Sequence, residues 1–169
     1  RNNGELDRNY VFSYNRNPLP PKNSSSTDHW GYYNVNSKST SDQTFHYAPS
    51  YYRTYRNSEG QIQTGIWKGI NKNSCSDRSQ YGVLTSIKFP TGAETHFEYE
   101  LNDFSNGFKD SADSLIRSGG GLRIKTICDL SDKGDTISVR TFAYTDETGK
   151  SSGTLMSVPE YHYKVTAGD

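Results

Sequence analysis

The segment from Tyr81 to Glu100 has the pattern of a β-hairpin, and it constrains the fold more than any other part of the chain. Its sequence is YGVLTSIKFPTGAETHFEYE, in which apolar and polar residues alternate on both sides of Pro90-Thr91-Gly92. Alternate side chains of a strand share one face, so each half predicts a strand with one apolar face. The three central residues suit a type I turn followed by a left-handed glycine.

The turn also predicts the register of this hairpin. A three-residue connection places Lys88 opposite Glu94 and brings the other residues together in four pairs: Phe89 with Ala93, Ile87 with Thr95, Thr85 with Phe97, and Val83 with Tyr99. A four-residue loop would instead place Phe89 opposite Glu94, so the hydrophobic pattern and the turn residues agree on one register.

A second segment, from Gly121 to Tyr144, repeats this arrangement with a longer turn. Its sequence is GLRIKTICDLSDKGDTISVRTFAY, with the turn expected over Ser131–Asp135. Its return strand is apolar on both faces, which predicts that it is the more buried one. A lone hairpin is marginally stable in water, so we expect both hairpins, with Phe97 and Phe142, to share one antiparallel layer.

The composition favours β-structure for the whole chain. Only 31% of the 169 residues are hydrophobic, yet 13% are aromatic, with thirteen Tyr and one Met. Tyr, Thr, Val and Phe suit a pleated, half-buried surface, whereas an amphipathic helix needs a stripe of residues such as Leu and Ala. We predict an all-β fold of antiparallel hairpins forming a meander sheet, with long irregular loops and at most one short helix, at Ser111–Arg117.

The chain divides into two regions that we expect to form one structural unit cut from a longer polypeptide. Residues 1–80 are rich in Tyr and in loop-forming residues and are expected to pack on the sheet, which residues 81–169 form. In the first region, Tyr10–Tyr14 predicts a strand, and 35–79 predicts a long excursion over the sheet. The segment 101–118 predicts a further loop.

Charge and hydropathy argue against a nucleic-acid partner and against a transmembrane segment. The formal net charge is zero, and no basic cluster is large enough to bind a phosphate backbone, so we expect no nucleic-acid partner. No stretch approaches the roughly 20 apolar residues that cross a bilayer, so we expect no transmembrane segment.

The two cysteines, Cys75 and Cys128, lack the close spacing of cysteine metal ligands. Cys128 is expected on an apolar strand face, which makes it a small buried hydrophobe; that face comprises Leu122, Ile124, Thr126, Cys128 and Leu130. A Cys75–Cys128 disulfide is the alternative interpretation, since sequence alone does not fix connectivity.

Three motifs resemble catalytic or binding sites, but each has a structural explanation. Neighbouring side chains of an extended segment diverge, so Asp28 and His29 are not expected to act as a pair; instead Asp28 makes a turn hydrogen bond and Trp30 anchors a loop on the sheet. The run Ser118–Gly121 leads into a strand, not into the helix that a phosphate loop requires, and predicts a flexible connection or a close approach of backbones.

The third motif comprises Glu94, His96 and Glu98, which share one strand face at a spacing that metal sites use. The same pattern is typical of the solvent face of a hairpin. We therefore expect no catalytic residues, no metal and no cofactor.

The hairpin of residues 82–100 resembles a YD repeat of the RHS family. Further motifs occur in the order found in the N-terminal portion of large secreted RHS-like surface proteins of Gram-negative gut and environmental bacteria: FSYN (Phe12–Asn15), LPP (Leu19–Pro21), DHWGYYN (Asp28–Asn34), GGLRIK (Gly120–Lys125) and GKSSGTLMSVPEYHY (Gly149–Tyr163). The resemblance implies a bacterial β-rich shell or surface module, secreted or at the cell surface, without catalytic residues in its repeats. Its partners would be neighbouring repeats of the parent polypeptide. Only two repeat-like units are present, so this piece alone cannot close a shell.

We therefore expect a non-enzymatic structural or interaction module. The alternative is a β-module that binds a carbohydrate or a surface protein, because aromatic faces stack on sugar rings. The ligand-binding residues would then be the aromatic residues of the N-terminal half: Trp30, Tyr32, Tyr33 and Trp67.

Overall fold

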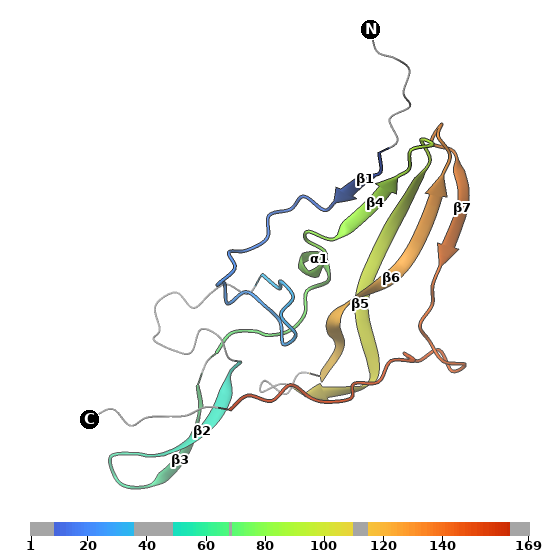
Figure 1. Cartoon of the computed structure of the whole chain (residues 1–169). Helices are drawn as coiled ribbons and strands as arrows, with labels where there is room; N and C mark the ends of the chain where they lie inside the picture. The colour runs from blue at the N-terminus through green and yellow to red at the C-terminus, as the bar shows by residue number, and fades with distance from the viewer. Residues whose placement is uncertain (1–8, 36–48, 68, 110–114, 163–169) are drawn as a thin grey trace.

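The chain folds around one antiparallel five-stranded sheet (Figure 1). The computed structural model describes residues 9–35, 49–67, 69–109 and 115–162. Across the sheet the strands follow the order β1 (Val11–Tyr14), β4 (Leu84–Lys88), β5 (Glu94–Lys109), β6 (Leu115–Leu130) and β7 (Thr136–Thr141). A separate hairpin consists of β2 (Tyr51–Arg56) and β3 (Ile62–Trp67), and α1 (Ser76–Ser79) is the one helix of the described residues. The predicted all-β, antiparallel class is confirmed.

The first hairpin has the predicted turn and register. Lys88 lies opposite Glu94, and the next pairs are Ile87 with Thr95 and Ser86 with His96. The Phe89 amide donates to the Ala93 carbonyl at 2.9 Å. Gly92 has the left-handed φ of 91° that the turn requires. The ladder ends at Ser86, so the two further expected pairs, Thr85 with Phe97 and Val83 with Tyr99, lie beyond it.

The second hairpin lies beside the first in the same sheet, because β5 pairs with β6. Its turn is the expected one: the Ser131 amide donates to the Asp135 carbonyl at 2.8 Å. The predicted burial of its return strand is wrong. β7 is one of the two outer strands of the sheet, and its Ile137 and Val139 are 66% and 57% exposed. Phe142 follows β7 and is also exposed, whereas Phe97 is half-buried.

The ribbon of β5 and β6 is longer than the sequence predicts. The loop predicted over 101–118 is wrong for the residues that are described there, 101–109 and 115–118, because Leu101 pairs with Leu122, Asp103 with Ser118, and Phe108 with Ile116. The expected helix is also wrong where it is described, since Leu115–Arg117 belong to β6; residues 111–114 lie outside the described residues. Three register shifts interrupt this ladder, and they disrupt the alternation by which a strand is recognised.

One of these shifts breaks the strand face predicted for β6. Glu98 pairs with Thr126 and the next residue, Tyr99, pairs with Ile124, so Lys125 is an extra residue on β6. A bulge of this kind changes the face on which later side chains lie. Cys128, predicted to be buried on that face, is half-buried opposite His96 and Val139. Both Cys75 and Cys128 are free thiols.

The N-terminal region contains more regular structure than expected. The predicted strand at Tyr10–Tyr14 is confirmed as β1, which begins one residue later and pairs with β4. The predicted excursion over 35–79 contains the β2–β3 hairpin, whose turn is closed by the Asn57 amide donating to the Gln61 carbonyl at 3.0 Å. Residues 36–48 and 68 of that segment lie outside the described residues.

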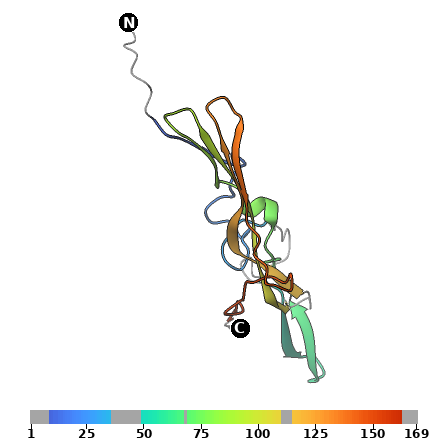
Figure 2. The ribbon, with the colours of Figure 1, turned by 90° about the vertical axis from the view of Figure 1, so that its right-hand side faces the viewer.

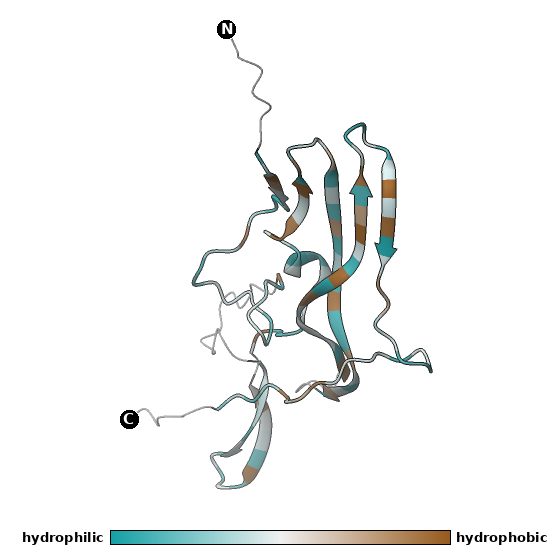
Figure 3. Ribbon diagram, turned by 45° about the vertical axis from the view of Figure 1, so that its right-hand side comes forward, coloured by the Kyte–Doolittle hydropathy of each residue, from teal (hydrophilic) through white to brown (hydrophobic). Residues whose placement is uncertain are grey.

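The hydrophobic core lies at the end of the β5–β6 ribbon that is far from the two hairpin turns. Its packed cluster comprises Phe104, Phe108 and Ile116, each no more than 9% exposed, with Trp30 and Leu155 packed against them. Ile70, 6% exposed, is buried outside this cluster. When the sheet is viewed close to edge-on, the hairpin tips extend as a single layer, whereas the N-terminal segment and α1 lie beside the middle of the sheet (Figure 2). Apolar and polar bands alternate along β6 and β7 (Figure 3).

Candidate functional site

The segment Asp28–Asn34 is a tight turn built around a buried carboxylate. Asp28 is 2% exposed, and its Oδ1 accepts hydrogen bonds from the Trp30 amide at 2.9 Å and the Tyr32 amide at 2.8 Å. Its Oδ2 accepts a hydrogen bond from Ser74 Oγ at 2.5 Å. The predicted turn hydrogen bond of Asp28 is therefore confirmed, and it fixes the position of Trp30.

His29 points to a different set of partners. Its Nδ1 lies 3.0 Å from the Tyr161 hydroxyl, and its ring lies 5.6 Å from the Phe108 ring, edge to face. Asp28 and His29 therefore do not form an acid–base pair, as the divergence of neighbouring side chains predicts.

Trp30 anchors this turn on the sheet, as expected. Its ring centroid lies 6.3 Å from that of Phe104 and 6.4 Å from that of Phe108. On the other side it meets Gly119, which has a φ of 146° and where a Cβ atom would overlap Trp30 Cζ3. The glycine run was predicted to be a flexible connection or a close approach of backbones, and both predictions are wrong. The run lies within β6, and an aromatic ring, not a second backbone, approaches it.

The four aromatic residues proposed from the sequence do not gather in one place. Tyr32 lies against Gly121, where a Cβ atom would be 2.5 Å from its hydroxyl. Tyr33 packs edge-on against Tyr81, with 5.5 Å between ring centroids. Trp67 pairs with Tyr51 in the β2–β3 hairpin, and its side chain lies outside the described residues. Of the three described side chains, Trp30 alone lines the cavity considered next.

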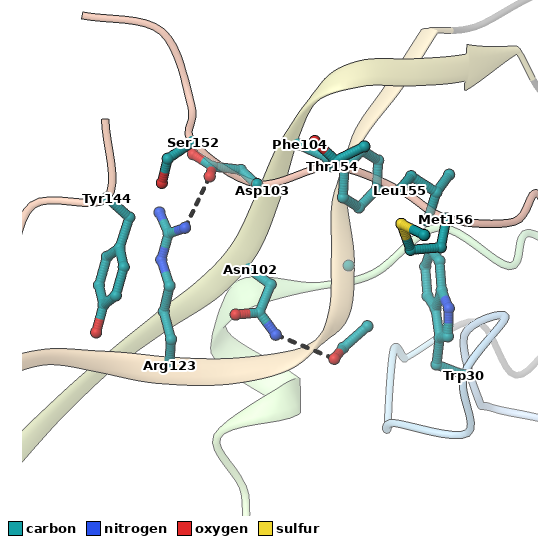
Figure 4. Close-up of a pocket in the computed structure, with 13 residues that line it drawn as sticks. Trp30, Asn102, Asp103, Phe104, Arg123, Tyr144, Ser152, Thr154, Leu155 and Met156 are labelled. Atoms are coloured by element: carbon teal, nitrogen blue, oxygen red, sulfur yellow. Dashed lines mark hydrogen bonds and ion pairs between the residues drawn. The ribbon is translucent and has the colours of Figure 1, made fainter. Parts of the chain in front are cut away.

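A cavity of about 380 Å³ lies between the β5–β6 ribbon and the C-terminal segment (Figure 4). In this view Arg123 and Tyr144 lie on one side, Trp30 and Met156 lie on the other, and Asn102 lies between them. The remaining lining residues are Asp103, Phe104, Gly119, Gly120, Ser152, Gly153, Thr154 and Leu155. The volume falls within the range of about 300–1,000 Å³ that small-molecule sites occupy.

Arg123 is the electrostatic centre of this cavity. Its Nη2 donates to Glu100 Oε1 at 2.7 Å, and its Nη1 donates to Asp103 Oδ1 at 2.8 Å. The guanidinium carbon lies 4.2 Å from the centroid of the Tyr144 ring, a cation–π contact. The hydroxyl of that ring donates to the Ile124 carbonyl at 2.7 Å. The Arg123 side chain is only 16% exposed, so these contacts hold it in one orientation.

Burial and hydrogen bonding shift the pKa values of Asp103 and Arg123 in opposite directions. Burial raises the pKa of Asp103, but hydrogen bonds from Ser151 and Arg123, together with the charge of Arg123, outweigh it and leave that pKa below its ordinary value. Burial lowers the pKa of Arg123, but its two carboxylate partners, Asp103 and Glu100, raise it by more, so the net shift is upward. The pair is therefore ionised near neutral pH.

The C-terminal segment is fastened across β5 and forms the rim of the cavity. Ser151 Oγ donates to Asp103 Oδ1 at 2.5 Å, and the Ser105 amide donates to the Gly153 carbonyl at 3.0 Å. Asn106 and Leu155 exchange two hydrogen bonds, of 2.9 and 2.7 Å, between the amide side chain and the backbone. These bonds order a segment that has no regular secondary structure.

Sequence reasoning missed this cavity, although one signal was present. Arg123 belongs to RIK, the densest basic patch of the chain, which lies in the first half of the hairpin predicted over Gly121–Tyr144. A half-buried arginine needs carboxylate partners, and Glu100 and Asp103 flank Leu101 and Asn102 on the neighbouring strand. The contribution of Tyr144 and of residues 151–156 could not be found, because it depends on how the C-terminal segment crosses β5.

The face of Glu94, His96 and Glu98 has the polar character expected of a hairpin surface. His96 Nε2 lies 3.0 Å from Glu94 Oε2, and Glu94 Oε1 lies 3.3 Å from Lys88 Nζ. The hydrogen bond with His96, followed by that with Lys88, lowers the pKa of Glu94. Within the described ranges, no three His, Cys, Asp or Glu side chains converge to hold a metal ion.

Comparisons with models of known protein families, with curated proteins and with solved structures find no match to this chain. None of its described helices combines the length and the apolar character needed to span a membrane. The interpretation of the cavity and of the sheet edges therefore depends on their own geometry.

Proposed function

We propose that this chain is a non-enzymatic, β-rich structural or interaction module of a large secreted or cell-surface protein of the RHS/YD-repeat type. In this proposal, strands of neighbouring repeats continue the sheet at its two outer edges. The observation that carries the proposal is the exposure of apolar side chains on both outer strands.

The two edges, β1 and β7, lie on opposite sides of the five-stranded sheet. Their most exposed apolar residues are Val11 (52%), Phe12 (53%) and Tyr14 (53%) on β1, and Ile137 (66%) and Val139 (57%) on β7. An outer strand with exposed apolar side chains is a template for pairing with another strand, and soluble monomers usually protect such strands with charges, prolines or a covering segment. Apolar residues on both outer strands fit a piece whose sheet is extended in its parent.

The small core supports the same interpretation. The core cluster lies at one end of the β5–β6 ribbon, while the hairpin tips form a single layer (Figure 2). Repeated hairpins reach full stability when stacking with their neighbours buries a shared face. Asp28, which with His29 resembles a catalytic pair, has structural partners. Its carboxylate accepts hydrogen bonds from Ser74 and from two backbone amides.

Self-association of the isolated chain tests this proposal. If the edges are built for strand pairing, the chain should associate in a concentration-dependent way, measured by sedimentation velocity. Val139→Lys places a charge on the outer strand β7 and should weaken that association about tenfold or more. Ile62→Lys is the matched control, because Ile62 is 67% exposed but belongs to the separate β2–β3 hairpin.

Two results would overturn the proposal. One is a chain that stays monomeric up to millimolar concentration, since its edges would then have no tendency to pair. The other is an enzymatic turnover that a single point substitution abolishes.

A further inference from the structure

We propose that the cavity lined by Trp30, Asn102, Arg123 and Tyr144 binds a neutral sugar ring. This goes beyond the module function and does not depend on it, because no residue of the cavity lining belongs to β1 or β7. The proposal rests on three features of the cavity: an apolar wall, fixed polar groups and charged side chains that are already paired with one another.

The apolar wall is provided by Trp30 with Phe104, Leu155 and Met156. Met156 is 91% exposed, an unusual position for a large apolar side chain, and it lies beside Trp30 at the mouth of the cavity (Figure 4). A pyranose ring carries C–H groups on one face and hydroxyls around its edge. An aromatic and thioether wall therefore suits the C–H face, because both groups are apolar and polarisable.

The polar groups are held in place before any ligand arrives. Asn102 Nδ2 donates to the Gly120 carbonyl at 3.1 Å, which orients its amide oxygen toward Arg123 (Figure 4). Asp103 and Arg123 form an ion pair with 2.8 Å between Oδ1 and Nη1, and the Tyr144 ring lies against the guanidinium. Planar amide, carboxylate and guanidinium groups are suited to the hydroxyls of a sugar, and fixing them in advance reduces the entropy that binding would otherwise cost.

The charge of the lining argues for a neutral ligand. Asp103 and Arg123 are the ionised residues of the lining, and Arg123 is already paired both with Asp103 and with Glu100, which lies outside the lining. An acidic sugar would compete with Asp103 for Arg123, and a cationic one would compete with Arg123 for Asp103. A neutral hexose or N-acetylhexosamine makes hydrogen bonds without disturbing the pair. The rim is also ordered by the Asn106–Leu155 hydrogen bonds, so the cavity is largely preformed.

Tryptophan fluorescence provides the test. The chain has two tryptophans, Trp30 and Trp67, so a Trp67→Phe variant reports on Trp30 alone. The probes are glucose, galactose, mannose and N-acetylglucosamine with their β1,4-linked disaccharides, and the charged counterparts are glucosamine and glucuronic acid. We expect at least one neutral sugar to change the Trp30 emission saturably, and to bind more tightly than either charged counterpart.

Two substitutions test whether the cavity is the site. Asn102→Leu keeps the side-chain volume but removes the amide, and Thr154→Phe fills the cavity from its exposed rim. Each should weaken binding about tenfold or more, since a sugar hydroxyl loses its partner or its space. Tyr14→Ala is the matched control, because it removes an exposed aromatic residue outside the cavity and should leave the affinity unchanged. A thermal melt of each variant verifies that it is folded.

Three outcomes would overturn this inference. The first is the absence of a saturable change with every neutral probe up to about 50 mM, a concentration at which even weak sugar sites are occupied. The second is tighter binding of glucosamine or glucuronic acid, which would identify a charged ligand. The third is an affinity that both cavity variants retain while folded.

Discussion

The two ends of the β5–β6 ribbon are built in different ways. Near the hairpin turns the ladder is regular, the side chains are half-exposed, and charged pairs such as Lys88 with Glu94 lie on the surface. At the opposite end the register shifts, and the ribbon carries the buried residues Phe104, Phe108 and Ile116. The regular end follows the sequence pattern closely, whereas the irregular end holds the core and the cavity.

This difference shows where a single sheet gains its stability. A regular strand pair with nothing packed on it exposes both of its faces to solvent, so it buries little apolar surface by itself. The irregular end departs from the alternation and accommodates the Trp30 ring at Gly119, which lets the N-terminal segment cover that end. We expect substitutions at the irregular end to be costly and matched substitutions near the turns to be mild.

The largest expected contrast is between two phenylalanines. Phe104→Ala should lower the free energy of unfolding by about 4 kcal/mol, because Phe104 is 6% exposed and its loss leaves a cavity beside Trp30. Phe142→Ala should cost about 1 kcal/mol, because Phe142 is already 40% exposed. Urea unfolding followed by far-UV circular dichroism measures both values. Equal losses would mean that burial is spread evenly along the ribbon.

A second contrast concerns two glycines with positive φ. Gly119→Ala should cost about 3 kcal/mol, since its Cβ would overlap the Trp30 ring in addition to straining the backbone. Gly134, in the β6–β7 turn, has a φ of 87° but open space around an added Cβ. Gly134→Ala should therefore cost only the backbone strain of a left-handed alanine, about 1 kcal/mol. The same denaturation experiment separates the two terms, and a larger loss at Gly134 would contradict this account of Trp30.

The ion pair of the cavity is expected to have an intermediate and pH-dependent effect. Asp103→Asn should cost about 1 kcal/mol at pH 7, a value reduced by solvent screening because the Asp103 side chain is 43% exposed. The pKa of Asp103 is depressed in the folded state, so its contribution is present above the ordinary value near 4 and is lost as the pH falls through the folded-state pKa. The difference between wild type and variant should therefore shrink as the pH falls below about 4. A difference that stays constant would exclude a role for ionised Asp103.

The smallest expected effect is at the regular end. Lys88→Met removes the partner of Glu94 but should leave the urea midpoint unchanged within error, because the Lys88 side chain is 53% exposed and surface ion pairs are screened. A clear loss of stability would show that surface pairing contributes more to this hairpin than the geometry suggests.

The extent to which the fold was predictable depends on how local the determining contacts are. The turn at Gly92, the strand β1 and the role of Asp28 were predictable, because turn residues, alternation and carboxylate caps act over a few positions. The β2–β3 hairpin was missed, although its turn is closed by Asn57, which accepts hydrogen bonds from the amides of Glu59 and Gln61. The exposure of β7 was predicted wrongly, because a strand that is apolar on both faces does not reveal whether a neighbour covers it.

The sequence by itself determined the strand β1, the turn and register of the first hairpin, and the anchoring turn of Trp30, since each depends on patterns of residues close in the chain. Tertiary structure alone decided the bulge at Lys125, the packing of Trp30 onto Gly119 and the cavity around Arg123. These features join residues as far apart as Trp30 and Met156, and no local pattern encodes which distant segment will cross a given strand. That choice is made by the burial of apolar surface in the assembled sheet.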